Sequence, residues 1–199
     1  VENLNVLPKP VQKPIPMHIA ISTSPESVDF AASKAMPIMV GGPTAVIGQI
    51  PQVIEMWHER MEHYGHLHEH IDLGAAQNVY VAPTMEEAER DLAGLEDEID
   101  AEFLRVGNPK NASGAVPAGY QHWQDRDKDR LVGEKKAREI GILPLVGTPE
   151  VVSERIEVLR SLGINSIRCN FGKAGLDQGK MRRCMHMFAE EVMPNFTEV

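Results

Sequence analysis

The chain has 199 residues, of which 42% are hydrophobic and 25% charged, the balance of a globular domain large enough for a buried core. Its formal net charge of −9 argues against nucleic-acid and anionic-membrane partners, and no apolar stretch approaches the ~20 residues that a membrane-spanning helix needs. The N-terminal residues 1–16 lack the apolar run of a secretion signal, and Cys169 and Cys184 give no disulfide framework or metal motif, so we expect a cytoplasmic protein.

The first half of the chain has the pattern of two strand–helix units. A short apolar run at residues 17–22 predicts a buried strand, and Ser24, followed by proline and glutamate, is typical of a helix start. A second apolar run at residues 37–40 predicts another strand. The apolar spacing that follows indicates a helix from about residue 50 to residue 64.

The third unit has a strand at residues 76–82 and a capping sequence at residues 84–87 that opens a long helix. Apolar residues repeat every three or four positions as far as Phe103, and the acidic residues between them are expected to face solvent. Residues 107–133 break this pattern, because they are rich in glycine, proline and charges of both signs. A segment of this length without periodicity is usually functional or mobile in a compact domain, so we predict a mobile insertion or lid there.

The fourth unit begins with Gly-Thr-Pro-Glu at residues 147–150, which starts a helix, and continues with a strand at residues 165–171 and a last helix. Strands that alternate with helices indicate a parallel α/β sheet. Four units fall short of the eight that close a barrel of ~250 residues. The chain also begins with Val instead of Met, so we expect that an N-terminal part is missing; the alternative is that a tag or a processing site gives this start.

The ends of the first two predicted strands offer candidate ligand-binding residues. The N-terminus of a helix presents free backbone N–H groups and a positive dipole end to an anion, and the hydroxyls of Thr23, Ser24 and Ser27 stand beside one. The alternative is that Ser24 only caps its helix, an ordinary role for serine at this position. Gly41 and Gly42 end the next strand, where glycine permits either close approach of a flat ligand or a tight turn.

Histidines gather in one stretch, with glutamates beside them: His58, His63, His66, His68 and His70. Their spacing differs from a zinc-protease helix, since His58 and His63 are five residues apart and lie on different helix faces. We therefore predict a surface cluster and no metal site; the alternative is that His63 or His66 approaches a substrate. The sequence also lacks a dinucleotide fingerprint, a nucleophile elbow and a catalytic cysteine motif, so no catalytic residue can be assigned from it.

Three segments together resemble the bacterial luciferase-like flavin monooxygenases, and the resemblance extends over nearly the whole chain. They are the proline-rich residues 8–16, residues 24–41 with Ser-Pro-Glu-Ser at their start, and residues 147–196 with Gly-Thr-Pro-Glu and Asn-Phe-Gly. Their order and spacing resemble the proline-rich lead into the fifth barrel strand, the fifth helix with the sixth strand, and the final unit of the family. Residues from about 107 to 138 match no segment of the family that we can place.

The resemblance implies a (β/α)8 TIM-barrel fold, of which this chain is the C-terminal four β/α units, a half-barrel forming one domain over residues 1–199. It implies that the phosphate of FMN binds at the turn of Ser24 and Ser27, whereas Thr23 falls where the family often has another polar residue. The implied chemistry is oxygenation of a small organic substrate by oxygen and reduced FMN, which a separate flavin reductase supplies. The absent strands hold the family's usual catalytic histidine, so we expect no independent activity.

Two alternatives stay open. The first is a barrel of the same family that uses a deazaflavin for hydride transfer. The second is a non-catalytic half-barrel in which two copies cover each other's open sheet edges. We expect a homo-oligomer, because the first and last strands have unpaired edges. We also expect alternate apolar strand residues, among them Ile38, Val40 and Val79, to face the absent half, although alternation alone does not decide which set points inward.

Overall fold

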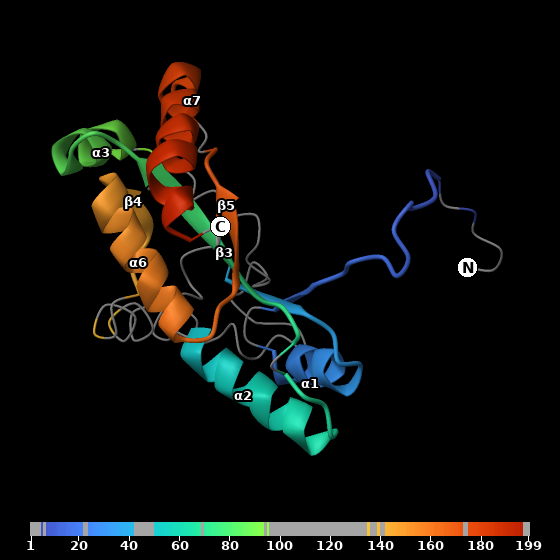
Figure 1. Cartoon of the computed structure of the whole chain (residues 1–199). Coiled ribbons are helices and arrows are strands. Elements are labelled where there is room, and N and C mark those ends of the chain that lie inside the picture. Colours follow the sequence, from blue (N-terminus) through green and yellow to red (C-terminus); the bar gives the residue numbers. More distant parts are fainter. Residues whose placement is uncertain are drawn as a thin grey trace, which may run out of the picture.

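The computed structural model describes residues 5, 7–21, 24–41, 50–68, 70–93, 95, 135, 139, 142–172 and 175–196, so the insertion predicted at residues 107–133 lies outside the described part. The elements alternate as the sequence predicts (Figure 1). In chain order they are β1 (Ile19–Ile21), α1 (Pro25–Ser33), β2 (Ile38–Gly41), α2 (Ile50–His63), β3 (Leu73–Val81), α3 (Met85–Leu92), β4 (Leu145–Gly147), α6 (Pro149–Ser161), β5 (Ser166–Asn170), α7 (Gln178–Met187), a π-helical turn (Phe188–Val192) and a 3-10 turn (Met193–Asn195). Within the described ranges, no helix is long and apolar enough to cross a membrane.

Three helices begin at hydroxyl residues that the sequence marks. In each, the side-chain oxygen accepts a hydrogen bond from the backbone N–H three residues further along; the pairs are Ser24 and Ser27 (3.4 Å), Thr84 and Glu87 (3.1 Å), and Thr148 and Val151 (3.5 Å). A cap of this kind stabilises a helix by about 0.5–2 kcal/mol. The local sequence therefore determines where these helices start.

The neighbours in the sheet follow the order of the chain. β1 pairs with β2, β2 with β3, and β3 with β5, all in parallel. Parallel strands that follow one another in sequence, with a helix in each connection, are the arrangement of a β/α barrel, whereas a doubly wound sheet reverses its order partway. β4 pairs with the C-terminal end of β3 and was not predicted from the sequence.

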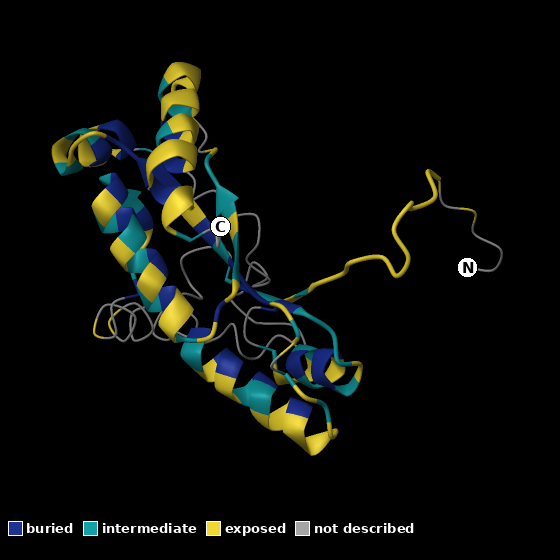
Figure 2. Ribbon diagram, viewed as in Figure 1, coloured by how far each residue is buried: buried dark blue, intermediate teal, exposed yellow. Residues whose placement is uncertain are grey.

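The helices cover one face of the sheet, which we call the covered face. Side chains alternate between the two faces of a strand, and the pairing register tells which residues share a face. Five residues of the covered face are at most 2% exposed and join the core with the apolar sides of the helices: Ile21, Ile38, Val40, Leu73 and Ala75. Figure 2 shows this buried layer where the strands meet the helices.

The opposite face, which we call the open face, carries mainly small and polar residues. Its members as far as Asn78 of β3 are Ala20, Met39, Gly41, Gly74, Ala76, Asn78, Ser166, Arg168 and Asn170. Beyond them on β3, Tyr80 is buried and bonded to Asp91 of α3. The expectation that Ile38, Val40 and Val79 face an absent half-barrel is therefore wrong. These side chains are buried under this chain's own helices, because the apolar stripe of each helix has to pack on an apolar sheet face.

The start of β3 also differs from the sequence-based expectation. β3 starts at Leu73 instead of residue 76, because β2 and β5 pair with its small residues on either edge, and such residues carry a weak strand signal. On the last helix, Cys184, Phe188 and Val192 follow one another at intervals of four residues and form the buried line, whereas Met185 is 47% exposed.

Candidate functional site

Ser24 and Ser27 lie in the first turn of α1, directly beyond the carboxyl end of β1, and both are half-buried. The Ser24 hydroxyl accepts the N–H of Ser27 and donates to the carboxylate of Glu26 at 2.7 Å. The exposed Glu26 carboxylate thus already lies at this N-terminus, as expected from the positive end of the helix dipole. The two hydroxyls stand at the positive end of the helix dipole and form a donor set that fits a phosphate, although Pro25 lacks an N–H and that of Ser27 donates to Ser24.

Gly41 ends β2, the neighbour of β1, so it lies at the same edge of the sheet as the start of α1. Its φ of +101° disfavours any residue with a side chain, and a Cβ at this position would lie 2.6 Å from the carbonyl oxygen of Ala76. The close approach that the glycine permits is therefore to the backbone of β3. Thr23 and Gly42, the other two predicted cofactor-binding residues, lie outside the described residues.

The carboxyl ends of parallel strands form the ligand-binding edge of β/α folds. The structure brings Ser24, Ser27 and Gly41 to this edge on two adjacent units, as the sequence predicts. The contact with the Ala76 backbone accounts for the glycine at position 41 without a ligand.

The expectation that the acidic residues of α3 face solvent is wrong for Asp91, which belongs to a partly buried ionic cluster that joins β3, α3 and α7. The side chain of Asp91 is fully buried, accepts a hydrogen bond from the Tyr80 hydroxyl at 2.8 Å, and accepts another from the Lys180 ammonium at 2.6 Å. Arg183 forms an ion pair with Glu87 and lies 3.9 Å from Asp91. Since each of these groups has a partner, the cluster holds α3 on α7 and offers no free group for catalysis.

The cluster shifts the acidity of its members in opposite directions. The Lys180 hydrogen bond lowers the pKa of Asp91, against the effect of burial, while burial and the Asp91 hydrogen bond raise the pKa of Tyr80 to about 12. The sequence contained one signal for it. Asp91 stands three residues after Ala88 on the inward stripe of α3, where a carboxylate needs a partner.

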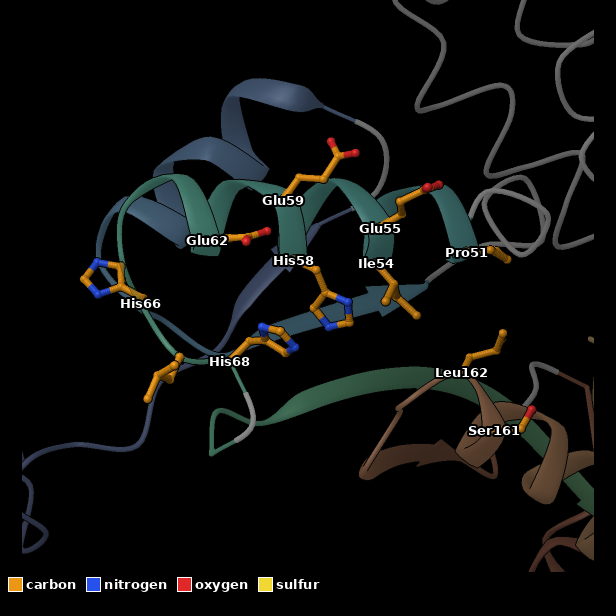
Figure 3. Close-up of a pocket in the computed structure, with 11 residues that line it drawn as sticks. Pro51, Ile54, Glu55, His58, Glu59, Glu62, His66, His68, Ser161 and Leu162 are labelled. Atoms are coloured by element: carbon orange, nitrogen blue, oxygen red, sulfur yellow. The ribbon is translucent and has the colours of Figure 1, made fainter.

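The histidine-rich stretch borders a cavity of about 630 Å³ between α2 and the C-terminal end of α6. The ring of His58 stacks on that of His68, with centroids 4.2 Å apart. Burial lowers the pKa of His58, and the neighbouring His68 lowers it further. Figure 3 shows the two rings beside each other, with Glu59 pointing away from them. Among the described residues, no three His, Cys, Asp or Glu side chains are placed to hold a metal ion.

This cavity lies at the amino ends of the strands, opposite the edge that carries the candidate site. The loop after α2 leads into the start of β3, so His66 lies near the amino ends of the strands. His63 ends α2 at the same level and packs edge-on against Tyr64. The alternative that His63 or His66 approaches a substrate at the ligand-binding edge is therefore wrong.

Neither cysteine has the setting of a nucleophile. Burial raises the pKa of the Cys169 thiol to about 11, and it also raises that of Cys184. The sulfur of Cys184 accepts the backbone N–H of Val81 at 3.1 Å in the core. Both thiols are protonated at neutral pH and act as packing residues.

Comparison with known proteins supplies the family context. Residues 1–166 match the sequence profile of the luciferase-like monooxygenase family. The FMNH2-dependent dimethylsulfone monooxygenase of Pseudomonas putida is 28% identical over 166 residues, which are 82% of this chain and 44% of that protein. The protein of the same name from Pseudomonas fluorescens is 28% identical over 106 residues, 52% of this chain and 28% of that protein. The chain thus spans less than half the length of these relatives.

Solved structures show the same fold. Monooxygenase RslO1 from Streptomyces bottropensis matches with a TM-score of 0.61 and 23% identity over 96% of this chain and 51% of its own. The FMN-bound oxygenating component of 3,6-diketocamphane monooxygenase from Pseudomonas putida has a TM-score of 0.56 at 17% identity, covering 92% of this chain and 48% of its own. The coenzyme F420-dependent tetrahydromethanopterin reductase of Methanopyrus kandleri has a TM-score of 0.56 at 15% identity, covering 93% and 52%. The chain therefore has the fold of about half of a (β/α)8 barrel.

Proposed function

Because the chain belongs to the luciferase-like monooxygenase family, we propose that it is the C-terminal part of a flavin-dependent monooxygenase that uses reduced FMN and oxygen to oxygenate a small organic substrate. The observation that carries the proposal is the start of α1, where Ser24 and Ser27 place two hydroxyls at the ligand-binding edge and at the positive end of the helix. Relatives named as FMNH2-dependent support the choice of cofactor.

In this proposal the chain binds and orients the flavin. The hydroxyls of Ser24 and Ser27 hold the phosphate at the positive end of α1, and the Ser24 hydroxyl turns from Glu26 to the phosphate. Thr23 and Gly42 would add contacts on either side, and Gly41 lets β2 lie close to the backbone of β3. Bound reduced flavin supplies the oxygen chemistry, while the residues of the protein position it and exclude water. No catalytic residue is assigned within this chain.

The remaining parts of the proposal concern partners and location. We expect the complete protein to receive reduced FMN from a separate flavin reductase, to form a homo-oligomer and to work in the cytoplasm. An apolar groove of about 860 Å³ runs along β5, lined by residues such as Ile167, Phe188 and the exposed Met185. This groove supports the expectation that the β5 edge is covered in the complete protein, either by the remaining strands or by a second copy.

A deazaflavin enzyme is the second candidate function. Its support is the likeness in fold to two F420-dependent enzymes, the tetrahydromethanopterin reductase and a secondary alcohol dehydrogenase, the latter with a TM-score of 0.52 at 14% identity. Because both cofactors carry a phosphate, the donors at the start of α1 suit either one.

Titration of the complete barrel protein with FMN, riboflavin and F420 distinguishes the two functions. We expect reduced FMN to bind at least tenfold more tightly than riboflavin, which lacks the phosphate, and more tightly than F420. Consumption of oxygen with an organic substrate in the presence of reduced FMN would support the monooxygenase. Tighter binding of F420, with hydride transfer and no oxygen consumption, would replace it with the deazaflavin enzyme.

A further inference from the structure

One charged side chain, Arg168, stands among the open-face residues that the structure describes. It is the third residue of β5 and is exposed, and none of the described carboxylates forms an ion pair with it. The register places Arg168 beside Ala76 of β3, and Ala76 beside Gly41 of β2. The guanidinium therefore stands in one row with two small residues, which leave space above the sheet.

In a closed barrel the open face lines the interior, where an unpaired cation is costly. Even after the surroundings relax, burying an ion costs several kcal/mol unless an opposite charge and further hydrogen bonds compensate for it. Arg168 stands two residues before the carboxyl end of β5, a span of about 7 Å that its long side chain can cover. The position therefore calls for an anion at the ligand-binding edge.

Two carboxamides stand next to this position. Asn170 ends β5 on the same face, and the register pairs it with Asn78 of β3. Asn78 is exposed and Asn170 half-buried, so both lie on accessible surface of the described chain. A planar guanidinium and two amides form a donor-rich set that suits the oxygens of a carboxylate or a sulfonate.

The flavin phosphate is not the anion that this set would bind. In the proposed function the phosphate lies beyond β1, and β1 is separated from β5 by β2 and β3. Three strand spacings amount to about 14 Å. The anion that binds Arg168 is therefore not the flavin phosphate.

We propose that Arg168, assisted by Asn78 and Asn170, binds a carboxylate or sulfonate group of the substrate and so selects anionic organic substrates. That the bound anion is a substrate rests on the proposed function, whereas the anion site itself is inferred from the sheet register. The guanidinium fork grips two oxygens of the anion, and the amides orient it relative to the ligand-binding edge.

Binding of two matched probes to the complete barrel protein, with and without FMN, tests the inference. Hexanesulfonate and hexanol share an alkyl chain and differ in charge, and both are titrated by calorimetry. We expect Arg168→Leu to weaken hexanesulfonate at least tenfold and hexanol less than twofold. Arg168→Lys should give an intermediate loss, because it keeps the charge and loses the fork. Arg182→Leu, which removes an exposed arginine of α7, is the matched control and should change neither affinity.

The opposite result is as well defined. If Arg168→Leu and Arg168→Lys both lower the melting temperature while the preference for hexanesulfonate stays the same, Arg168 pairs with a carboxylate of the protein and the inference is wrong. It is also wrong if the unaltered protein does not prefer hexanesulfonate over hexanol. FMN affinity, measured in parallel, separates these outcomes from failure of the proposed function, because a protein that lacks a flavin site can still show the Arg168-dependent anion preference.

Discussion

The covered and open faces of the sheet are built by the same strands and carry opposite kinds of side chain. Ile38 and Val40 on the covered face are fully buried under the helices, whereas Asn78 and Arg168 on the open face are exposed. Because neighbouring residues of a strand point to opposite faces, one position separates a core residue from a candidate ligand contact. Stability and recognition can therefore be altered independently along each strand.

The largest expected effect comes from the adjacent pair Ile38 and Met39 on β2. Ile38→Ala should lower the free energy of unfolding by about 2–5 kcal/mol, since it leaves a cavity in a fully buried site. Met39→Ala, on the open face and half-buried, should cost no more than about 1 kcal/mol. Urea unfolding of both variants measures the difference. Equal losses would contradict the assignment of the two faces.

The Asp91 cluster should give the next largest effect and should depend on pH. Asp91→Asn weakens charged hydrogen bonds with Lys180 and Tyr80, so we expect a loss of about 1.5–3 kcal/mol at pH 7. The pKa of Asp91 is lower in the folded state than in the unfolded state, so its contribution is present above the unfolded pKa of about 4 and disappears as the pH falls through the folded value.

Unfolding of the two proteins between pH 7 and pH 2 checks this dependence. The stability difference between them should shrink on acidification, whereas the exposed control Glu86→Gln should stay close to the unaltered protein throughout. A difference that stays constant down to pH 2 would show that the Asp91 charge contributes nothing.

The smallest expected effect concerns thiol reactivity on the two faces. Cys169 belongs to the covered side of β5, and its pKa of about 11 leaves little thiolate at pH 8. A thiol introduced on the open face by Ser166→Cys should react with iodoacetamide at least tenfold faster than Cys169. Mass spectrometry of timed samples gives both rates. Faster alkylation of Cys169 would mean that the groove along β5 leaves this thiol accessible.

Local signals in the sequence predicted most of the fold. The caps at Ser24, Thr84 and Thr148 determine helix starts through hydrogen bonds within three residues, so they are readable without tertiary information. The sequence did not show which face of each strand the helices cover, because alternation identifies two faces without distinguishing them. The same limit applies to β3, whose first three residues are strand because of partners far away in the chain.

The candidate site was predictable to the same extent. Ser24 and Ser27 were found because a hydroxyl cap leaves a local pattern, and the structure places them at the ligand-binding edge. Arg168 and Asp91 were missed, since their significance depends on the register between strands and on contacts between helices distant in sequence.

The central claim is that the start of α1 holds the flavin phosphate, and the double variant Ser24→Ala with Ser27→Ala tests it most directly. In the complete barrel protein we expect it to weaken FMN binding at least tenfold, about 1.4 kcal/mol, and riboflavin binding much less. Ser33→Ala, at the other end of the same helix, is the matched control and should leave both affinities unchanged. Calorimetric titration measures all three proteins with both ligands. A loss confined to FMN is the predicted result, and equal losses for FMN and riboflavin would contradict the phosphate site.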